Sequence, residues 1–208
     1  MWWPRVLENV LNTMTNTKTH QHFILHKPFG FLSQLINNQN RRKNKRLLGE
    51  LYNFPAGTMA IGRLDETSEG LLLLTTDGKE SAYIRSQNVE KEYYVQVDGI
   101  ITETAIEHLQ KGVEISINGE KYMTKPCKAY LVDAVTHLPF ENRHVRDERH
   151  GPKSWASITL TEGKFRQVRK MTAAVGFPTL RLVRVRIGNI KLSLDSGKIE
   201  EVSTFNLY

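Results

Sequence analysis

The chain has 208 residues, of which 39% are hydrophobic and 9% aromatic, enough to bury the core of one sizeable domain or two small lobes. Its 29 lysine and arginine residues exceed its 22 acidic residues, and the net charge of +7 favours a polyanionic partner. One cysteine, Cys127, excludes an internal disulfide framework and a cysteine-rich zinc site. No run approaches the roughly 18 apolar residues of a membrane span and no secretory leader is visible, so we expect a cytoplasmic protein.

Residues 1–22 are polar, rich in Asn and Thr and weakly patterned, and we interpret them as an N-terminal extension before one domain over 23–208. The stretch HFILHK at 22–27 predicts a short strand that Pro28 and Gly30 end. Residues 37–46 predict a loop, in which the last six positions hold five basic residues. This basic cluster is either a solvated loop or a contact surface.

The next segment predicts strand, loop, strand and helix in turn. Residues 58–61 predict a short strand, and 62–69, which have no apolar periodicity, predict a loop. Four leucines at 71–74 are typical of a buried strand, although a helix is an alternative. Residues 80–86 predict a short helix.

The middle of the chain contains two further strands, a capped helix and a hairpin. Residues 92–97 (EYYVQV) and 155–160 are strands by composition. Thr102 is a suitable N-cap for a helix that runs through Leu109. The Asn-Gly pair at 118–119 predicts a tight hairpin turn.

The excess positive charge lies in one block near the C-terminus. Residues 164–191 contain no acidic residue and eight basic ones, which are Lys164, Arg166, Arg169, Lys170, Arg181, Arg184, Arg186 and Lys191. A helix over 165–175 would place the basic residues at 166, 169 and 170 on one face. A strand over 179–187 would place Arg184 and Arg186 on one face, because strand side chains alternate with a period of two. Together they predict a phosphate-contacting surface for RNA or DNA.

The predicted strands occur in runs with three short helices between them, rather than in a regular alternation of strand and helix. This pattern favours an α+β fold with a mixed, largely antiparallel central sheet and short flanking helices.

The loop GRLDETSEG at 62–70 is the strongest candidate for chemistry, because a rigid sheet positions the loop that enters a buried strand. From the residues alone, Asp65 either reacts, caps a turn or forms a structural ion pair. The chain contains no phosphate-binding loop, dinucleotide fingerprint or serine-nucleophile elbow. Its scattered histidines have no cysteine partners, so we expect no metal site.

Four segments, in the same order, resemble the motifs of one enzyme family. They are Lys27–Ser33 (KPFGFLS), Gly62–Gly78 (GRLDETSEGLLLLTTDG), Lys91–Tyr93 (KEY) and Glu162–Met171 (EGKFRQVRKM) with the Val-Gly pair at 175–176. This combination, together with the tail RVRIG at 184–188, resembles the RsuA/RluB/RluE/RluF group of RNA pseudouridine synthases over residues 22–203. Many relatives carry an extra RNA-binding domain of the S4 type before the first motif, and we expect none here.

The resemblance implies a pseudouridine synthase fold with a catalytic cleft, and isomerisation of uridine to pseudouridine within RNA. Asp65 takes the place of the catalytic aspartate, either as a nucleophile at C1′ or through a glycal intermediate. The resemblance places Arg169 beside it, where a guanidinium would offset the cost of a buried carboxylate. Tyr93 matches the active-site tyrosine that stacks on the uracil. Arg63 would fill the position that the flipped uridine leaves.

We expect further RNA contacts from the basic block, at Lys164, Arg166, Lys170, Arg184 and Arg186. The partner implied is ribosomal RNA, most specifically 23S rRNA, with no cofactor, no membrane and no obligate protein partner, and we expect a monomer. The alternatives are the same chemistry on 16S rRNA or tRNA, and a non-catalytic RNA-binding or ribosome-assembly protein.

Overall fold

The computed structural model describes residues 20–36, 44–132, 140–141 and 143–208. The N-terminal extension predicted for residues 1–22 therefore lies outside the described residues, apart from its last three. The strands are β1 (His22–Lys27), β2 (Phe31–Leu32), β3 (Arg46–Leu47), β4 (Met59–Ile61), β5 (Glu69–Thr75), β6 (Lys91–Asp98), β7 (Glu114–Ile117), β8 (Glu120–Met123), β9 (Lys128–Val132), β10 (Lys153–Leu160), β11 (Thr179–Ile187), β12 (Ile190–Lys191) and β13 (Ile199–Val202). The helices are η1 (Leu48–Glu50), α2 (Gly78–Ser86), α3 (Glu103–Lys111), η2 (Glu148–His150) and α4 (Gln167–Ala174). In these ranges no helix is long and apolar enough to cross a membrane.

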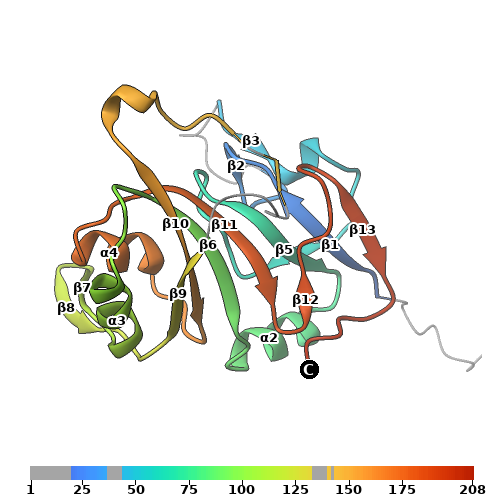
Figure 1. Cartoon of the computed structure of the whole chain (residues 1–208). Helices are drawn as coiled ribbons and strands as arrows, with labels where there is room; N and C mark the ends of the chain where they lie inside the picture. Colours follow the sequence, from blue (N-terminus) through green and yellow to red (C-terminus); the bar gives the residue numbers. More distant parts are fainter. Residues whose placement is uncertain (1–19, 37–43, 133–139, 142) are drawn as a thin grey trace, which may run out of the picture.

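One large sheet organises the molecule (Figure 1). Within the described residues it has nine strands in the order β13-β1-β5-β11-β6-β10-β9, with β12 paired to β11 and β4 paired to β5. The pairing of β11 with β5 is parallel, and the other pairings in this sheet are antiparallel. The predicted α+β class with a mixed, largely antiparallel sheet is confirmed.

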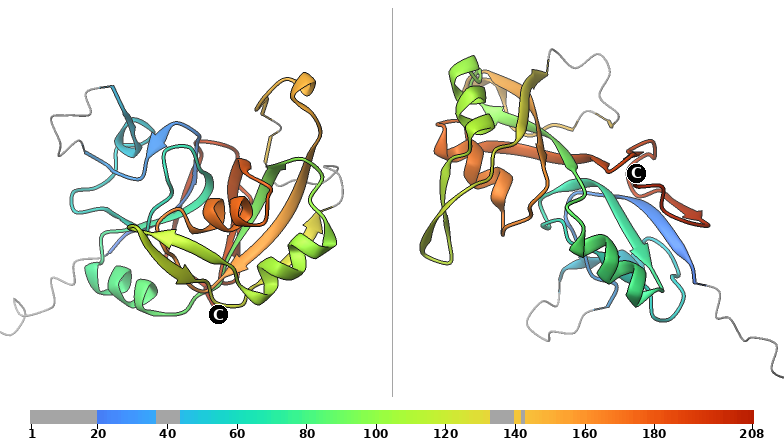
Figure 2. Two further views of the ribbon diagram at one scale, coloured as in Figure 1. Left: turned by 90° about the vertical axis from the view of Figure 1, so that its left-hand side faces the viewer. Right: turned by 90° about the horizontal axis from the view of Figure 1, so that it is seen from below.

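Strand β11 joins two halves of this sheet, because it pairs with β5 on one side and with β6 on the other. On the β6 side, α3 packs against β9 and α4 packs against β11, and they enclose a core that includes Val95, Leu109 and Met171. On the β5 side, α2 packs against β4 and β5. In the right-hand view of Figure 2, helices α3 and α4 lie on one side of the sheet's centre and helix α2 lies on the other.

The four leucines of β5 form a strand that is buried on both faces. Leu71 and Leu73 pack into one apolar cluster, and Leu72 and Leu74 pack into another with Phe23. All seven residues of β5 are buried, which is why the segment reads as a continuous apolar run instead of an alternation. The strand interpretation is confirmed and the helix alternative is wrong.

Two local signals also produce the expected structures. Asn118 and Gly119 have φ angles of 52° and 89°, the left-handed backbone that a two-residue hairpin between β7 and β8 requires. The hydroxyl of Thr102 accepts a hydrogen bond of 3.2 Å from the amide of Ala105 and so caps α3.

The expectation that Arg184 and Arg186 share a face is wrong. The register of β11 against β6 shifts between them, so that Arg184 lies opposite Tyr93 and Arg186 lies opposite Glu92. Because Tyr93 and Glu92 are consecutive, they point to opposite faces of the sheet, and the two arginines do the same. A β-bulge adds one residue to the strand, and the period of two fails across it.

The helix predicted over 165–175 is shorter than expected. Helix α4 begins at Gln167, and Arg166 before it has the left-handed φ of 53°. Arg166 is therefore not on a helix face with Arg169 and Lys170. Its backbone turns the side chain away from the helix, toward the loop before β5.

Gly70 allows β5 and β11 to approach at the start of their parallel pairing. It lies opposite Arg184 and has a φ of 103°. A Cβ at this position would collide with the carbonyl oxygen of Arg184 and lie 2.7 Å from its backbone nitrogen. Only glycine fits both the backbone conformation and the space.

We therefore expect Gly70→Ala to lower the free energy of unfolding by about 2–4 kcal/mol, from backbone strain and overpacking together. Gly57→Ala is the matched control, because Gly57 has a φ of 86° but a Cβ there would meet no atom within 4 Å. It should lose only about 1–2 kcal/mol. Urea unfolding measures both, and equal losses would contradict the collision at Gly70.

Candidate active site

The loop that carries Asp65 connects β4 to β5 and is tied to its surroundings on both sides. The amide of Ser68 donates to the carbonyl of Asp65 at 3.0 Å, which closes a turn around the aspartate. The amide of Gly30 donates to the carbonyl of Glu66 at 2.8 Å. The turn after β1 and the rigid strand β5 therefore position the loop.

A cleft of about 80 Å³ opens beside Asp65. Its walls come from the loop at 63–68, from Tyr93 on β6 and from the segment 162–168 before and at the start of α4. Asp65 has a side chain that is 30% exposed, so its carboxylate is accessible from this cleft. Residues far apart in the sequence, Asp65 and Tyr93, thus line one hollow.

Two carboxylates line the cleft, and they differ in how fully their oxygens are used. Glu162 accepts hydrogen bonds from the Tyr122 hydroxyl at 2.6 Å and from the Lys125 amide at 2.9 Å. Asp65 has an ion pair with Arg166 at 3.6 Å, which is longer than a hydrogen bond. Asp65 therefore keeps oxygen lone pairs for a ligand, whereas Glu162 serves to join neighbouring segments.

The structure pairs Asp65 with Arg166 at 3.6 Å, and the guanidinium of Arg169 contacts the loop backbone instead. The guanidinium of Arg169 donates to the carbonyl of Thr67 at 2.9 Å and lies 3.4 Å from the Ser68 hydroxyl. Burial and the nearby charge of Arg166 lower the pKa of Arg169, while the charge of Asp65 opposes this change. Arg169 thus supports the backbone of the loop that bears the acid.

The predicted RNA contacts separate into exposed and internally paired side chains. Arg63 and Lys164 are exposed at the cleft. Lys170 instead donates to the carbonyl of Ser116 at 2.7 Å and joins α4 to the β7–β8 hairpin.

Arg184 and Arg186, for which we predict phosphate contacts, both have partners inside the protein. Arg184 is only 3% exposed and donates to the carbonyl of Leu71 at 2.7 Å. Arg186 pairs with Glu90 at 3.1 Å and with Glu92 at 2.9 Å, so two carboxylates already balance its charge. A run of basic residues in the sequence does not reveal which of them the fold neutralises.

Comparison with known proteins assigns the chain to a protein family. The family model described as RNA pseudouridylate synthase matches residues 21–174. The chain belongs to this family. The expected family is therefore confirmed, and the match includes the loop of Asp65 and the strand of Tyr93.

Relatives in the RNA pseudouridylate synthase family match most of the chain. Ribosomal large subunit pseudouridine synthase E of Vibrio parahaemolyticus serotype O3:K6 is 41% identical over 182 residues, which cover 86% of this chain and 72% of the relative. The protein of the same name from Xanthomonas axonopodis pv. citri is 40% identical over 171 residues, covering 81% and 86%. A solved structure described as a pseudouridylate synthase shares the fold with a TM-score of 0.69 and 28% identity, covering 88% of this chain and 70% of that one.

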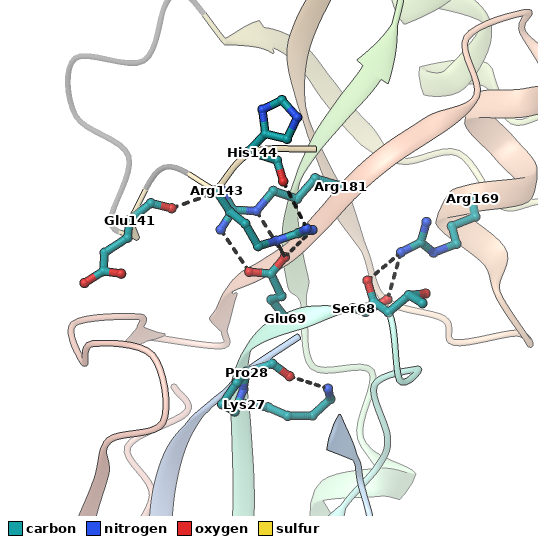
Figure 3. A network of polar contacts seen from close by, with 10 residues as sticks. Lys27, Pro28, Ser68, Glu69, Glu141, Arg143, His144, Arg169 and Arg181 are labelled. Carbon is teal, nitrogen blue, oxygen red and sulfur yellow. Dashed lines mark hydrogen bonds and ion pairs between the residues drawn. The ribbon is translucent and has the colours of Figure 1, made fainter. Parts of the chain in front are cut away.

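The loop that carries Asp65 ends at Glu69, which forms a buried ion pair with Arg181 (Figure 3). The sequence did not reveal this pair. Glu69 accepts hydrogen bonds from Arg181 at 3.1 and 2.9 Å and from Arg143 at 3.2 and 3.3 Å. Glu69 and Arg181 have side chains that are 5% and 3% exposed. Arg181 stood out only as one cation of the basic block, and no spacing linked it to an acid 112 residues earlier.

Lys27, at the end of β1, is a second buried charged residue near the loop that carries Asp65. Its side chain is 0% exposed and donates to the carbonyl of Pro28 at 2.8 Å, as Figure 3 shows. Burial lowers the pKa of Lys27 to about 8, although the charges of Glu69, Asp65 and Glu66 oppose the shift. The ammonium group is therefore costly to keep charged in this position.

Cys127 has the properties of a packed thiol. Its Sγ lies 3.1 Å from the carbonyl oxygen of Leu109, and burial raises the pKa of the thiol to about 11. A thiol with so high a pKa is a poor nucleophile at neutral pH.

The buried ammonium of Lys27 makes stability depend on pH. The pKa falls from 10.5 unfolded to about 8 folded, so the folded state binds fewer protons between these values and wild-type stability rises with pH there. Below pH 8 the cost, roughly 3 kcal/mol, is fully present. Lys27→Met removes it, so we expect the variant to gain on the wild type by up to about 3 kcal/mol at pH 7. Urea unfolding from pH 7 to 10 should show the gain shrink, and a gain independent of pH would contradict the assignment.

Proposed function

We propose that this protein isomerises a uridine of large-subunit ribosomal RNA to pseudouridine, with Asp65 as the catalytic carboxylate. The observation that carries the proposal is the part-exposed Asp65 in a cleft with Tyr93, with no hydrogen bond to its carboxylate from the described residues and a cation 3.6 Å away. We also propose that the catalytic unit is one domain over residues 23–208, and that it works as a cytoplasmic monomer.

The reaction detaches uracil from C1′ at N1 and rejoins it through C5. The N1–C1′ bond breaks and leaves a uracil anion, the base rotates, and the C5–C1′ bond forms. The C5 proton is then lost and N1 gains a proton, so the product is an isomer of the substrate. Asp65 acts either by attacking C1′ or by removing a ribose proton to give a glycal, and both routes begin with the ionised carboxylate.

Two arginines act on Asp65 in different ways. Arg166 faces the carboxylate at 3.6 Å, and Arg169 holds the backbone at Thr67. The positive charge of Arg166 offsets the cost of removing water from Asp65 when the RNA fills the cleft. In this proposal Arg166 replaces Arg169 as the direct partner of the acid.

Tyr93 and Arg63 complete the site. The ring of Tyr93 lies in the cleft wall, where it can stack on the uracil. The target uridine must leave its stack to reach Asp65, at a cost of a few kcal/mol. Arg63 is exposed at the cleft and long enough to occupy the position that the base leaves.

The names of the relatives support large-subunit rRNA as the substrate of this protein. Two relatives that are about 40% identical over more than four fifths of the chain are named as large-subunit enzymes. A different RNA, such as 16S rRNA or tRNA, is the second candidate, since phosphate contacts alone do not select a sequence.

Asp65→Asn should abolish isomerisation while RNA binding stays within about threefold, because it removes the reactive charge at nearly constant shape. Tritium release from 23S rRNA labelled at C5 of uridine measures turnover, and filter binding measures affinity. Turnover by the variant at the wild-type rate would exclude Asp65 as the catalytic group. The wild-type protein is assayed on the other RNAs as well. Tritium release from labelled 16S rRNA or tRNA instead of 23S rRNA would identify the other substrate, and no release from any of the three would favour an RNA-binding protein without activity.

Replacing Arg63 and Lys164 together with Ala should weaken RNA binding and reduce its salt dependence. Each lost phosphate contact lowers the slope of log K against log salt by about 0.7–0.9. Lys191→Ala is the control, because Lys191 lines a hollow with Glu92 and Tyr94 away from the catalytic cleft. Binding titrations from 50 to 200 mM salt measure the slopes, and an unchanged slope in the double variant would refute the phosphate role.

A further inference from the structure

The hydroxyl of Ser33 satisfies both backbone polar groups of the residue before Asp65. Ser33 Oγ donates to the carbonyl of Leu64 at 2.8 Å, and the amide of Leu64 donates to Ser33 Oγ at 3.0 Å. Ser33 is 9% exposed and Leu64 is 7% exposed. Buried backbone groups need partners, and here one side chain supplies the donor and the acceptor together.

The same segment of chain also holds the residue after Asp65. The amide of Gly30 donates to the carbonyl of Glu66 at 2.8 Å. Residues 30 and 33 thus bracket Asp65, one on each side of it in the sequence. The backbone at Leu64 cannot rotate without breaking both bonds to Ser33.

Asp65 depends on this bracket because its own side chain is weakly held. Its ion pair with Arg166 measures 3.6 Å between Arg166 Nη1 and Asp65 Oδ2. Arg166 itself is exposed, with 42% of its side chain accessible. Such a pair contributes little to fixing a position. The direction of the carboxylate therefore follows from the main chain at residues 64 to 66.

We propose that Ser33 is a positioning residue for Asp65, and that its hydroxyl sets the angle at which the carboxylate meets the ribose. This inference rests on the proposed function, because it assumes that Asp65 reacts. Displacement of a reacting group by about 1 Å can cost about 100-fold in rate. Loss of the Ser33 hydroxyl should therefore lower kcat far more than it changes KM.

The chain offers a closely matched control in Ser154. Its hydroxyl donates to the carbonyl of Gly99 at 2.8 Å and accepts from the amide of Ile101 at 2.8 Å. Ser154→Ala loses the same two kinds of hydrogen bond as Ser33→Ala, but on the β10 side of the sheet and outside the cleft lining. A purely structural role predicts the same effect for both variants.

The test measures kcat and KM by tritium release under conditions where thermal melts show each variant folded. Ser33→Ala should lower kcat by roughly 10- to 100-fold with KM within threefold, while Ser154→Ala keeps kcat within twofold. Equal kcat values for the two alanine variants would overturn the inference.

Two further variants keep the test decisive if Ser33→Ala does not fold. The side chains of threonine and valine have the same shape, but only threonine carries a hydroxyl. The kcat of Ser33→Thr should therefore exceed that of Ser33→Val by at least tenfold. Equal values would overturn the positioning role. Asp65→Asn is assayed in parallel: if that variant turns over normally, the proposed function fails, whereas loss of activity there with no effect at Ser33 defeats only this inference.

Discussion

The ion pair between Glu69 and Arg181 lies where the loop that carries Asp65 enters the sheet, and the rest of the candidate site is arranged around it. Glu69 is the first residue of β5 and Arg181 lies on β11, so the pair joins the two central strands at their parallel seam. Both side chains are almost fully buried. A buried carboxylate without its cation would be strongly destabilising, so the start of β5 has one acceptable position.

Around this pair the loop is held by contacts to its backbone, and among the described residues the carboxylate of Asp65 has one ion pair, with Arg166. Arg169 binds the carbonyl of Thr67, Gly30 binds that of Glu66, and Ser33 binds both groups of Leu64. The protein uses its strongest interactions to fix the backbone, and leaves the carboxylate of Asp65 open to the cleft. A side chain whose backbone is fixed in this way needs no rearrangement when a ligand enters the cleft.

Sequence reasoning succeeded where the signal is local and failed where it depends on long-range pairing. The leucine run of β5, the Asn-Gly hairpin and the Thr102 cap depend on near neighbours and were predicted. The opposite faces of Arg184 and Arg186 result from a bulge against β6, which no periodicity in β11 reveals. The family motifs led to Asp65 and Tyr93, yet the partner of Asp65 is Arg166, because a left-handed residue before α4 redirects that side chain.

The order of strands has a consequence for the way the protein is made. Strands β5 and β6 are neighbours in sequence, but β11 separates them in space and is synthesised about 80 residues later than β6. A nascent chain that stops before Thr179 contains Asp65 and Tyr93 but lacks the strand that sets them across from each other. The cleft therefore reaches its final form late in translation, because the pairing of β11 with β5 and β6 brings the loop of Asp65 and Tyr93 together and such long-range contacts form slowly.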